Sequence, residues 1–231
     1  MGFKLDKIIP WGRSLDEYIA MFHLTSRDRE LTILDCAGGP ASFNIEMTRQ
    51  GNKVISCDPI YQFTADEINQ RIQEIYQTVI QGVKANFNCY NWTDFESPEQ
   101  LGEIRMKAMQ QFLEDLPLGI QEKRYVTAEL PSLPFKNHQF DLALCSHFLF
   151  TYSDHLSPEF HLASINELCR IAQEVRIFPL LKLSGESVPI LPEIIKELVK
   201  QGYSAEIVEV CYEFQHGGNQ MLRIKTGNTT L

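Results

Sequence analysis

The sequence has no run of apolar residues long enough to cross a membrane, and its first residues include no apolar segment of signal-peptide length. Basic residues are not in excess either, because 21 Lys and Arg stand against 30 Asp and Glu, giving a formal net charge of −9. A surface of that sign repels nucleic acids and anionic lipid headgroups. We therefore expect a cytoplasmic protein with no membrane partner and no nucleic-acid partner.

Metal-ligand spacing is also missing. The six cysteines form no C-x-x-C pair, the spacing typical of structural zinc sites, and several lie inside apolar runs. We expect reduced thiols in the core and no metal. At 231 residues, 44% of them hydrophobic and 22% charged, the chain resembles an ordinary globular protein and is expected to form one domain over residues 1–231.

Short apolar segments alternate with helical patterns along the chain, which predicts a doubly wound, mostly parallel α/β sheet. The segments Thr32–Cys36 and Lys53–Asp58 flank a helix predicted over about 41–50, so the three form a βαβ unit. Three further strands are expected, at about 124–127, 140–145 and 174–178. Near the C-terminus, apolar residues alternate over 208–215, and a Gly217-Gly218-Asn219 turn leads into 220–226, which predicts an antiparallel strand pair.

More than 60 residues separate the second and third predicted strands, far more than one crossover needs. Thr64 and Ser97 are expected to cap two long helices, so residues 62–122 are predicted to form a helical insertion or lid. An aromatic-rich stretch over 86–95 joins the two helices, and packing between them is its simplest explanation. Residues 1–30 are expected to form an N-terminal helical segment that begins with a capping box at Ser14.

In open α/β sheets, ligands bind beyond the carboxyl ends of the strands, so the residues at these ends are the candidates for a site. The first strand ends in Asp35-Cys-Ala-Gly-Gly-Pro-Ala41, a run of small residues that lets a ligand approach the backbone. The second strand ends in Asp58, whose carboxylate can accept hydrogen bonds from both ribose hydroxyls. Glu129 follows the third strand, and Ser146 with His147 follows the fourth.

These segments resemble the class I S-adenosylmethionine-dependent methyltransferases. Leu34-Asp-Cys-Ala-Gly-Gly39 is similar to the family's first motif, hydrophobic-Asp-x-Gly-x-Gly-x-Gly, with Ala37 and Ala41 replacing two glycines. Glu129, ahead of Leu133-Pro-Phe135, resembles the acid of the Asp-Ala-x-x-Leu-Pro-Phe segment, and Phe140-Asp-Leu-Ala-Leu-Cys-Ser-His147 resembles the fourth-strand segment. Alanine is the mildest replacement where the backbone avoids positive φ.

The resemblance implies a seven-stranded Rossmann-like sheet that closes with an antiparallel pair. It also implies S-adenosylmethionine as cofactor, with S-adenosylhomocysteine as product, and a small-molecule methyl acceptor. The residues expected to contact the cofactor are Asp35, Ala37, Gly38, Gly39, Asp58, Pro59, Glu129, Leu130 and Ser146.

His147 is the candidate catalytic base, because it directly follows the central strand; packing of its ring beneath Phe148-Leu149-Phe150 is the alternative. Trp11-Gly12-Arg13 is a candidate to fold over the cofactor, with Arg13 meeting the methionine carboxylate. The alternative is an exposed arginine beside the capping box.

Two other functions compete with this interpretation. One is a catalytically silent protein that binds the nucleoside as a sensor or scaffold. The other is a nicotinamide-dependent oxidoreductase, which the sequence disfavours. It retains one of the three glycines of G-x-G-x-x-G, it places Pro40 where a phosphate needs an N–H donor, and it has no Tyr-x-x-x-Lys pair.

Overall fold

The structure is a computed structural model, and it describes residues 9–227. A seven-stranded sheet forms its centre, with strand order β3-β2-β1-β4-β5-β7-β6. The strands are β1 (Thr32–Cys36), β2 (Lys53–Cys57), β3 (Tyr125–Val126), β4 (Phe140–Ser146), β5 (Ala172–Phe178), β6 (Ser204–Glu209) and β7 (Gln220–Lys225). The first five run parallel, and β7 pairs antiparallel with both β5 and β6. This is a doubly wound, Rossmann-like sheet that closes with an antiparallel pair, as expected from the sequence.

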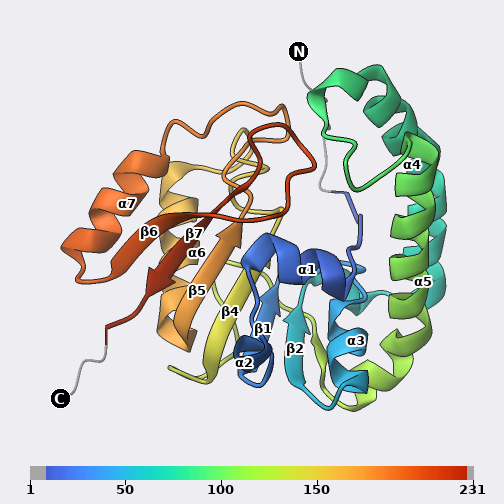
Figure 1. Ribbon diagram of the computed structural model, residues 1–231. Helices are drawn as coiled ribbons and strands as arrows, with labels where there is room; N and C mark the ends of the chain where they lie inside the picture. Colours follow the sequence, from blue (N-terminus) through green and yellow to red (C-terminus); the bar gives the residue numbers. More distant parts are fainter. Residues whose placement is uncertain (1–8, 228–231) are drawn as a thin grey trace.

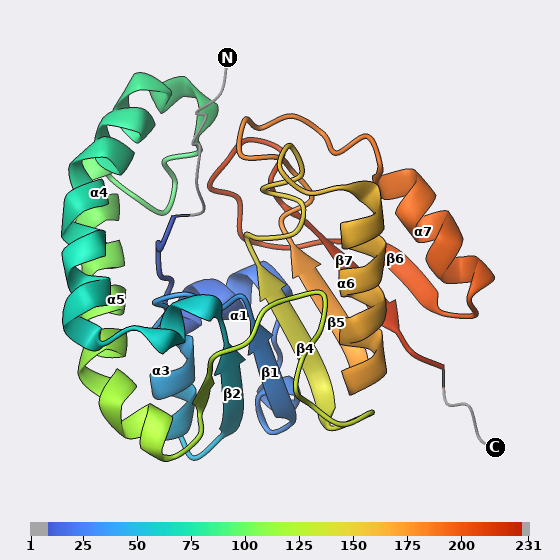
Figure 2. The same cartoon turned by 180° about the vertical axis from the view of Figure 1, so that it is seen from behind.

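Helices cover both faces of the sheet (Figures 1 and 2). They are α1 (Leu15–Phe22), α2 (Ser26–Arg29), α3 (Phe43–Arg49), α4 (Ala65–Ala85), α5 (Pro98–Gln121), α6 (Pro158–Ile171) and α7 (Leu191–Lys200), with short 3-10 turns at Pro59–Gln62 and Phe87–Cys89. One core packs α1 and α3 against Ile33, Leu142 and Leu144 of the sheet. The other packs α6 and α7 against Leu34 and Val175. Because β1 and β4 are buried on both faces, they are continuous apolar runs rather than alternating ones.

The two helices α4 and α5 lie side by side along one edge of the molecule (Figure 1). They begin where the sequence predicts, since Thr64 forms a capping box with Glu67, and the Ser97 hydroxyl accepts a hydrogen bond from the backbone N–H of Gln100. Their shared core includes Ile72 and Phe112. The helical pair therefore occupies residues 65–121, and the role of a lid stays a prediction.

The predicted C-terminal strand pair forms, but the expected tight turn is wrong. Pairing of β6 with β7 stops at Glu209 opposite Gln220, so residues 210–219 form a long loop. The alternating apolar residues that suggested a strand over 208–215 do not all lie in the sheet. Tyr212 and Phe214 leave the sheet and pack against α1 and against the segment between α4 and α5. Tertiary packing therefore overrides the period-two pattern there.

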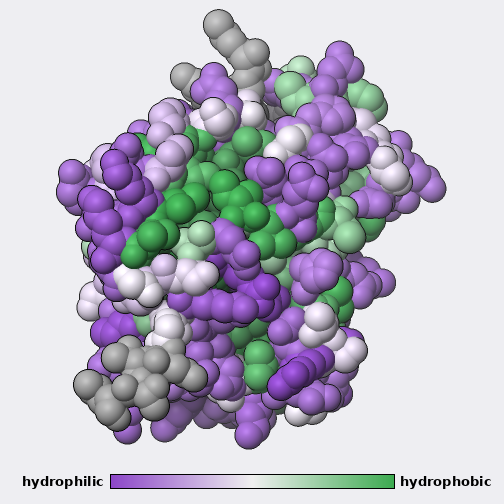
Figure 3. Space-filling view, turned by 60° about the vertical axis from the view of Figure 1, so that its left-hand side comes forward, coloured by the Kyte–Doolittle hydropathy of each residue, from purple (hydrophilic) through white to green (hydrophobic). Residues whose placement is uncertain are grey.

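Figure 3 shows the hydropathy of one face of the molecule. With α7 and β6 turned forward, most of the visible face is hydrophilic and the hydrophobic side chains gather in one area of its upper half. Val199 of α7 and Ile207 of β6 are among the exposed apolar residues. Within residues 9–227, no helix is long and apolar enough to cross a membrane.

Candidate functional site

A pocket of about 760 Å³ lies at the carboxyl ends of β1, β2 and β4. This is the position where the strand order reverses from β1-β2 to β1-β4, the usual ligand site of such sheets. One wall comes from residues 9–13 and from α4 and α5; the other comes from the loops after β4, β5 and β6. Its volume is typical of small-molecule sites.

The turn after β1 forms the floor of the pocket. Ala37 and Gly39 both adopt the left-handed conformation, with φ of +56° at each. Alanine is the mildest replacement for glycine only where φ is negative, and that condition is not met at Ala37, which therefore carries a strain that glycine would not. Gly38 has a different requirement, because a Cβ at that position would lie 2.2 Å from Asp35 Oδ2.

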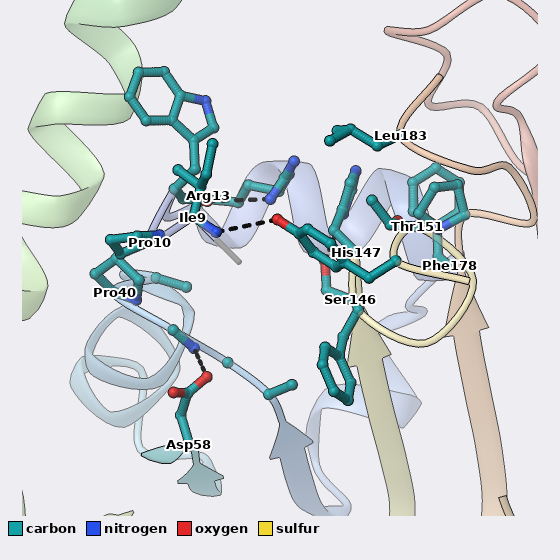
Figure 4. A pocket seen from close by; sticks show the side chains of 18 of the residues that line it. Ile9, Pro10, Arg13, Pro40, Asp58, Ser146, His147, Thr151, Phe178 and Leu183 are labelled. Carbon is teal, nitrogen blue, oxygen red and sulfur yellow. Dashed lines mark hydrogen bonds between the residues drawn. The ribbon is translucent and has the colours of Figure 1, made fainter. Parts of the chain in front are cut away.

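Asp58 lies beside this turn at the end of β2 (Figure 4). Its Oδ2 accepts the backbone N–H of Gly39 at 3.0 Å, and its Oδ1 accepts the N–H of Ile60 at 2.9 Å. Each oxygen retains a second lone pair, and the residue lines the pocket. Burial raises the pKa of Asp58 to about 6, because the two hydrogen bonds only partly offset the cost of removing the charge from water.

Asp35 occupies a different place from the one that the sequence suggests. It lies under the turn, does not line the pocket, and accepts hydrogen bonds from Ser56 Oγ at 2.8 Å and Tyr18 Oη at 3.0 Å. Burial raises its pKa to about 7. The contact with Gly38 indicates that Asp35 shapes the turn from below rather than touching a ligand.

The remaining predicted cofactor residues do line the pocket. Glu129 and Leu130 follow β3, Ser146 ends β4, and Pro59 follows Asp58. The Leu130 side chain is buried whereas Glu129 is exposed, which gives this end an apolar surface with an acid at its rim. The structure thus brings eight of the nine predicted cofactor residues to one cavity, and Asp35 is the exception.

His147 also lines the pocket, with a φ of +50° that is uncommon for a residue other than glycine. The backbone N–H of His147 donates to the Phe178 carbonyl at 2.6 Å. In its side chain, Nδ1 lies 2.9 Å from Ser146 Oγ, and the ring packs edge-on against that of Phe178. Burial holds the pKa of His147 well below its usual value, and the neighbouring guanidinium groups of Arg13 and Arg105 lower it further. The imidazole is therefore neutral at physiological pH.

The segment ahead of α1 forms part of the wall (Figure 4). Gly12 lies directly on the turn, since a Cβ there would be 2.0 Å from the Pro40 carbonyl oxygen. The Arg13 carbonyl accepts the N–H of Ser42 at 3.0 Å, and the N–H of Ile9 donates to Tyr152 Oη at 3.1 Å. The Arg13 side chain faces the pocket and has no ion pair within residues 9–227.

Sequence reasoning missed Glu17, Arg105 and Tyr212, which come together from α1, α5 and the loop after β6. Glu17 and Arg105 form a buried ion pair, and Tyr212 Oη lies 3.1 Å from Arg105 Nη2 and 3.2 Å from Glu17 Oε1. Arg105 and Tyr212 line the pocket. A polar side chain on the apolar stripe of a helix is the only local signal, and it does not identify partners this distant.

The aromatic stretch between α4 and α5 packs against both helices, as expected, because Phe95 lies in one cluster with Val83 of α4 and Leu101 of α5; it also reaches the loop after β6. The Tyr90 ring stacks on Phe214 at 4.6 Å, and Trp92 and Phe95 contact the same ring edge-on. The backbone continues this contact, because Asn91 donates to the Phe214 carbonyl at 2.6 Å. This connection between the helical pair and the loop after β6 closes one end of the pocket.

Within residues 9–227, no group of three or more His, Cys, Asp or Glu side chains is placed to hold a metal ion. The cysteines there are free, and the four at positions 36, 57, 145 and 169 are buried.

The chain is 35% identical over 215 residues to the uncharacterized protein MJ0045 of Methanocaldococcus jannaschii, an alignment that covers 93% of this chain and 94% of that protein. The chain belongs to the MJ0045 family. A protein at this identity over nearly its full length shares the fold, and the MJ0045 family thereby has the sheet described above. No family model matches the chain.

Solved structures with a similar chain path include two methyltransferases. Magnesium protoporphyrin IX methyltransferase from Synechocystis PCC 6803, crystallised with bound S-adenosylmethionine, is 16% identical with a TM-score of 0.48, over 92% of this chain and 78% of that chain. A SAM-dependent methyltransferase from Aquifex aeolicus is 15% identical with a TM-score of 0.38, over 84% and 80%. Superpositions this loose do not define the site, whose function rests on its own geometry.

Proposed function

We propose that the protein is an S-adenosylmethionine-dependent methyltransferase that acts on a small molecule. The observation that carries the proposal is the position of Asp58. Its carboxylate lies at the carboxyl end of β2, is fixed by the N–H of Gly39, and faces a pocket at the point where the strand order reverses. A ribose is the group that such a carboxylate suits best.

The other pocket residues fit the rest of this cofactor. A Cβ built on Gly39 meets no atom within 4 Å, so the space over the turn is open to a ligand. Leu130 offers an apolar surface to a base and Glu129 an acceptor for an exocyclic amino group. Arg13, which has no acid partner in the described chain, suits the methionine carboxylate.

When bound, the cofactor would supply a sulfonium methyl, an electrophile strong enough to need little further activation. The protein then has to align the acceptor and exclude water, which the closed end of the pocket favours. That closure supports a small acceptor over a nucleic acid, and the acidic net charge supports the same conclusion.

Thermal unfolding with S-adenosylhomocysteine tests the proposal. At 100 times its Kd, this ligand should stabilise the protein by about 2.7 kcal/mol, while NADH at the same concentration should leave the melting temperature unchanged. Stabilisation by NADH alone would contradict the assignment.

Transfer itself is tested by incubating the protein with S-adenosylmethionine that carries a labelled methyl group and a metabolite extract. Label should appear in a fraction of low molecular mass. Binding without any transfer would support a silent sensor or scaffold instead.

A further inference from the structure

One part of the pocket is left unexplained by the cofactor. Away from Asp58 and Glu129, the wall is built by six apolar or aromatic side chains, those of Trp11, Val79, Val83, Tyr90, Leu101 and Phe214. We call this part the lid chamber. It lies between α4, α5 and the loop after β6, so it is available to the methyl acceptor.

The lid chamber offers no carboxylate to a cation among residues 9–227. The carboxylates that line the pocket in the described chain are Asp58 and Glu129, and both lie at the cofactor end. The guanidinium of Arg105 borders the chamber; it is 1% exposed, is paired with Glu17, and its Nε has no hydrogen-bond partner among residues 9–227. Its lining of rings and branched aliphatic chains instead suits an aromatic body.

A buried hydroxyl marks where a polar group of the acceptor would lie. Thr151 is 7% exposed, lines the pocket, and its Oγ1 has no hydrogen-bond partner within the described chain. Figure 4 places Thr151 and His147 on the same wall, facing the side that holds Arg13. A buried hydroxyl without a partner is unfavourable, so an occupant of the pocket is expected to bond to it.

His147 supplies the complementary acceptor on this wall. When its Nδ1–H donates to Ser146 Oγ, its Nε2 is left with a free lone pair. The ring is uncharged because it is buried and faces two guanidinium groups, so it accepts a hydrogen bond from a hydroxyl and does not donate one from this nitrogen.

We infer that the lid chamber binds an aromatic hydroxyl compound, and that Thr151 and His147 orient its oxygen toward the methyl donor. The inference rests on the proposed methyltransferase function. The hydroxyl oxygen forms a bond to the methyl carbon as the carbon–sulfur bond breaks, and the sulfur keeps that electron pair as a neutral thioether. The hydroxyl proton passes to His147 Nε2 and from there to solvent.

The test uses protein saturated with S-adenosylhomocysteine and two probes of equal size, 2-naphthol and 2-naphthylmethylammonium, followed by the fluorescence of the probe. The naphthol should bind at least about tenfold more tightly than the ammonium compound. Equal binding of the two, or tighter binding of the cation, would overturn the inferred substrate class.

Thr151→Val keeps the shape of the side chain and removes the hydroxyl, and it should weaken naphthol binding about threefold to tenfold. Thr127→Val, an exposed position outside the pocket, is the matched control and should bind as the unaltered protein does. Unaltered naphthol binding by Thr151→Val would overturn the placement of the acceptor oxygen.

Calorimetry with S-adenosylhomocysteine alone distinguishes a failure of the proposed methyltransferase function from a failure of the inferred acceptor class. It also reports whether each variant is folded. If this ligand does not bind, the proposed function fails; if it binds and 2-naphthol does not, only the inference about the acceptor fails.

Discussion

Two aspartates at the ends of neighbouring strands, Asp35 buried and Asp58 half-buried, have different surroundings and different tasks. Asp58 accepts backbone N–H groups and faces the pocket, whereas Asp35 accepts side-chain hydroxyls beneath the turn. Both have raised pKa values, to about 6 and about 7, because burial disfavours the charged form. The structural difference predicts that pH acts on ligand binding through Asp58 and on stability through Asp35.

Asp58→Ala should weaken S-adenosylhomocysteine binding by about 1–3 kcal/mol, because it removes charge-assisted hydrogen bonds to the ribose. Calorimetry at pH 7.5 measures the loss, with the exposed Asp66→Ala as the control. A folded Asp58→Ala protein with undiminished affinity would remove this residue from the site.

The same contact predicts a pH dependence. Since the charged carboxylate is the stronger acceptor, S-adenosylhomocysteine affinity should be constant above about pH 7 and fall as the pH drops through the pKa of Asp58, about 6. In Asp58→Asn this fall should disappear. Titration calorimetry between pH 5 and pH 8 checks it, and a fall that persists in Asp58→Asn would assign the titration to another group.

Asp35 should make the protein less stable as the pH rises, whereas Asp58 should make ligand binding tighter. The folded pKa of Asp35, about 7, lies above the roughly 3.9 of an unfolded chain, so its contribution is fully present below pH 4 and is lost as the pH rises through 7. Urea unfolding should show that the stability of the unaltered protein relative to Asp35→Asn decreases between pH 5 and pH 7 by roughly 1.4 kcal/mol per unit at most. A pH-independent difference would contradict the assignment.

At the scale of elements, the Glu17–Arg105 ion pair joins the helix ahead of the sheet to the inserted helical pair. Both side chains are buried, and the charge of each is balanced chiefly by the other. A buried ion pair adds little to the free energy of unfolding, because desolvation of the two charges offsets their attraction. Removing one partner, however, leaves an uncompensated charge inside the protein.

Glu17→Gln and Arg105→Met should therefore each cost about 3–5 kcal/mol, while the double variant should cost clearly less than their sum. Urea unfolding of the three variants measures the coupling. Additive losses would show that the two side chains act independently.

At the scale of the whole molecule, the pocket depends on a contact between segments more than 100 positions apart. Tyr90, Trp92 and Phe95 surround Phe214, and the N–H of Asn91 donates to the Phe214 carbonyl. These residues connect the inserted helices to the far edge of the sheet. Phe95 is buried, but the rings of Tyr90, Trp92 and Phe214 are only half-buried, so this contact is the part of the pocket expected to open first.

Phe214→Ala should loosen this connection while leaving the sheet intact. Hydrogen exchange of the Asn91 and His216 amides, which bond across the contact, should accelerate at least tenfold. Exchange in β4, the centre of the sheet, should stay slow. Equal acceleration in both places would mean that the substitution destabilises the whole protein rather than this contact.

The sequence by itself determined the order of elements and most of the cofactor end of the pocket. Strands buried on both faces are continuous apolar runs, and caps such as Thr64 with Glu67 are local, so both can be read without a fold. Asp58 and Glu129 follow from the rule that parallel strands present their carboxyl ends at one edge.

Only the tertiary structure decided the lid chamber and the strain in the turn. Ala37 has positive φ because the surrounding chain imposes it, and Tyr212 and Phe214 leave a strand-like pattern because burial against α1 and residues 90–95 outweighs local preference. Arg105 and Glu17 meet across distant elements, which no local pattern records. Periodicity and caps arise from neighbours along the chain, whereas these pairings arise from neighbours in space.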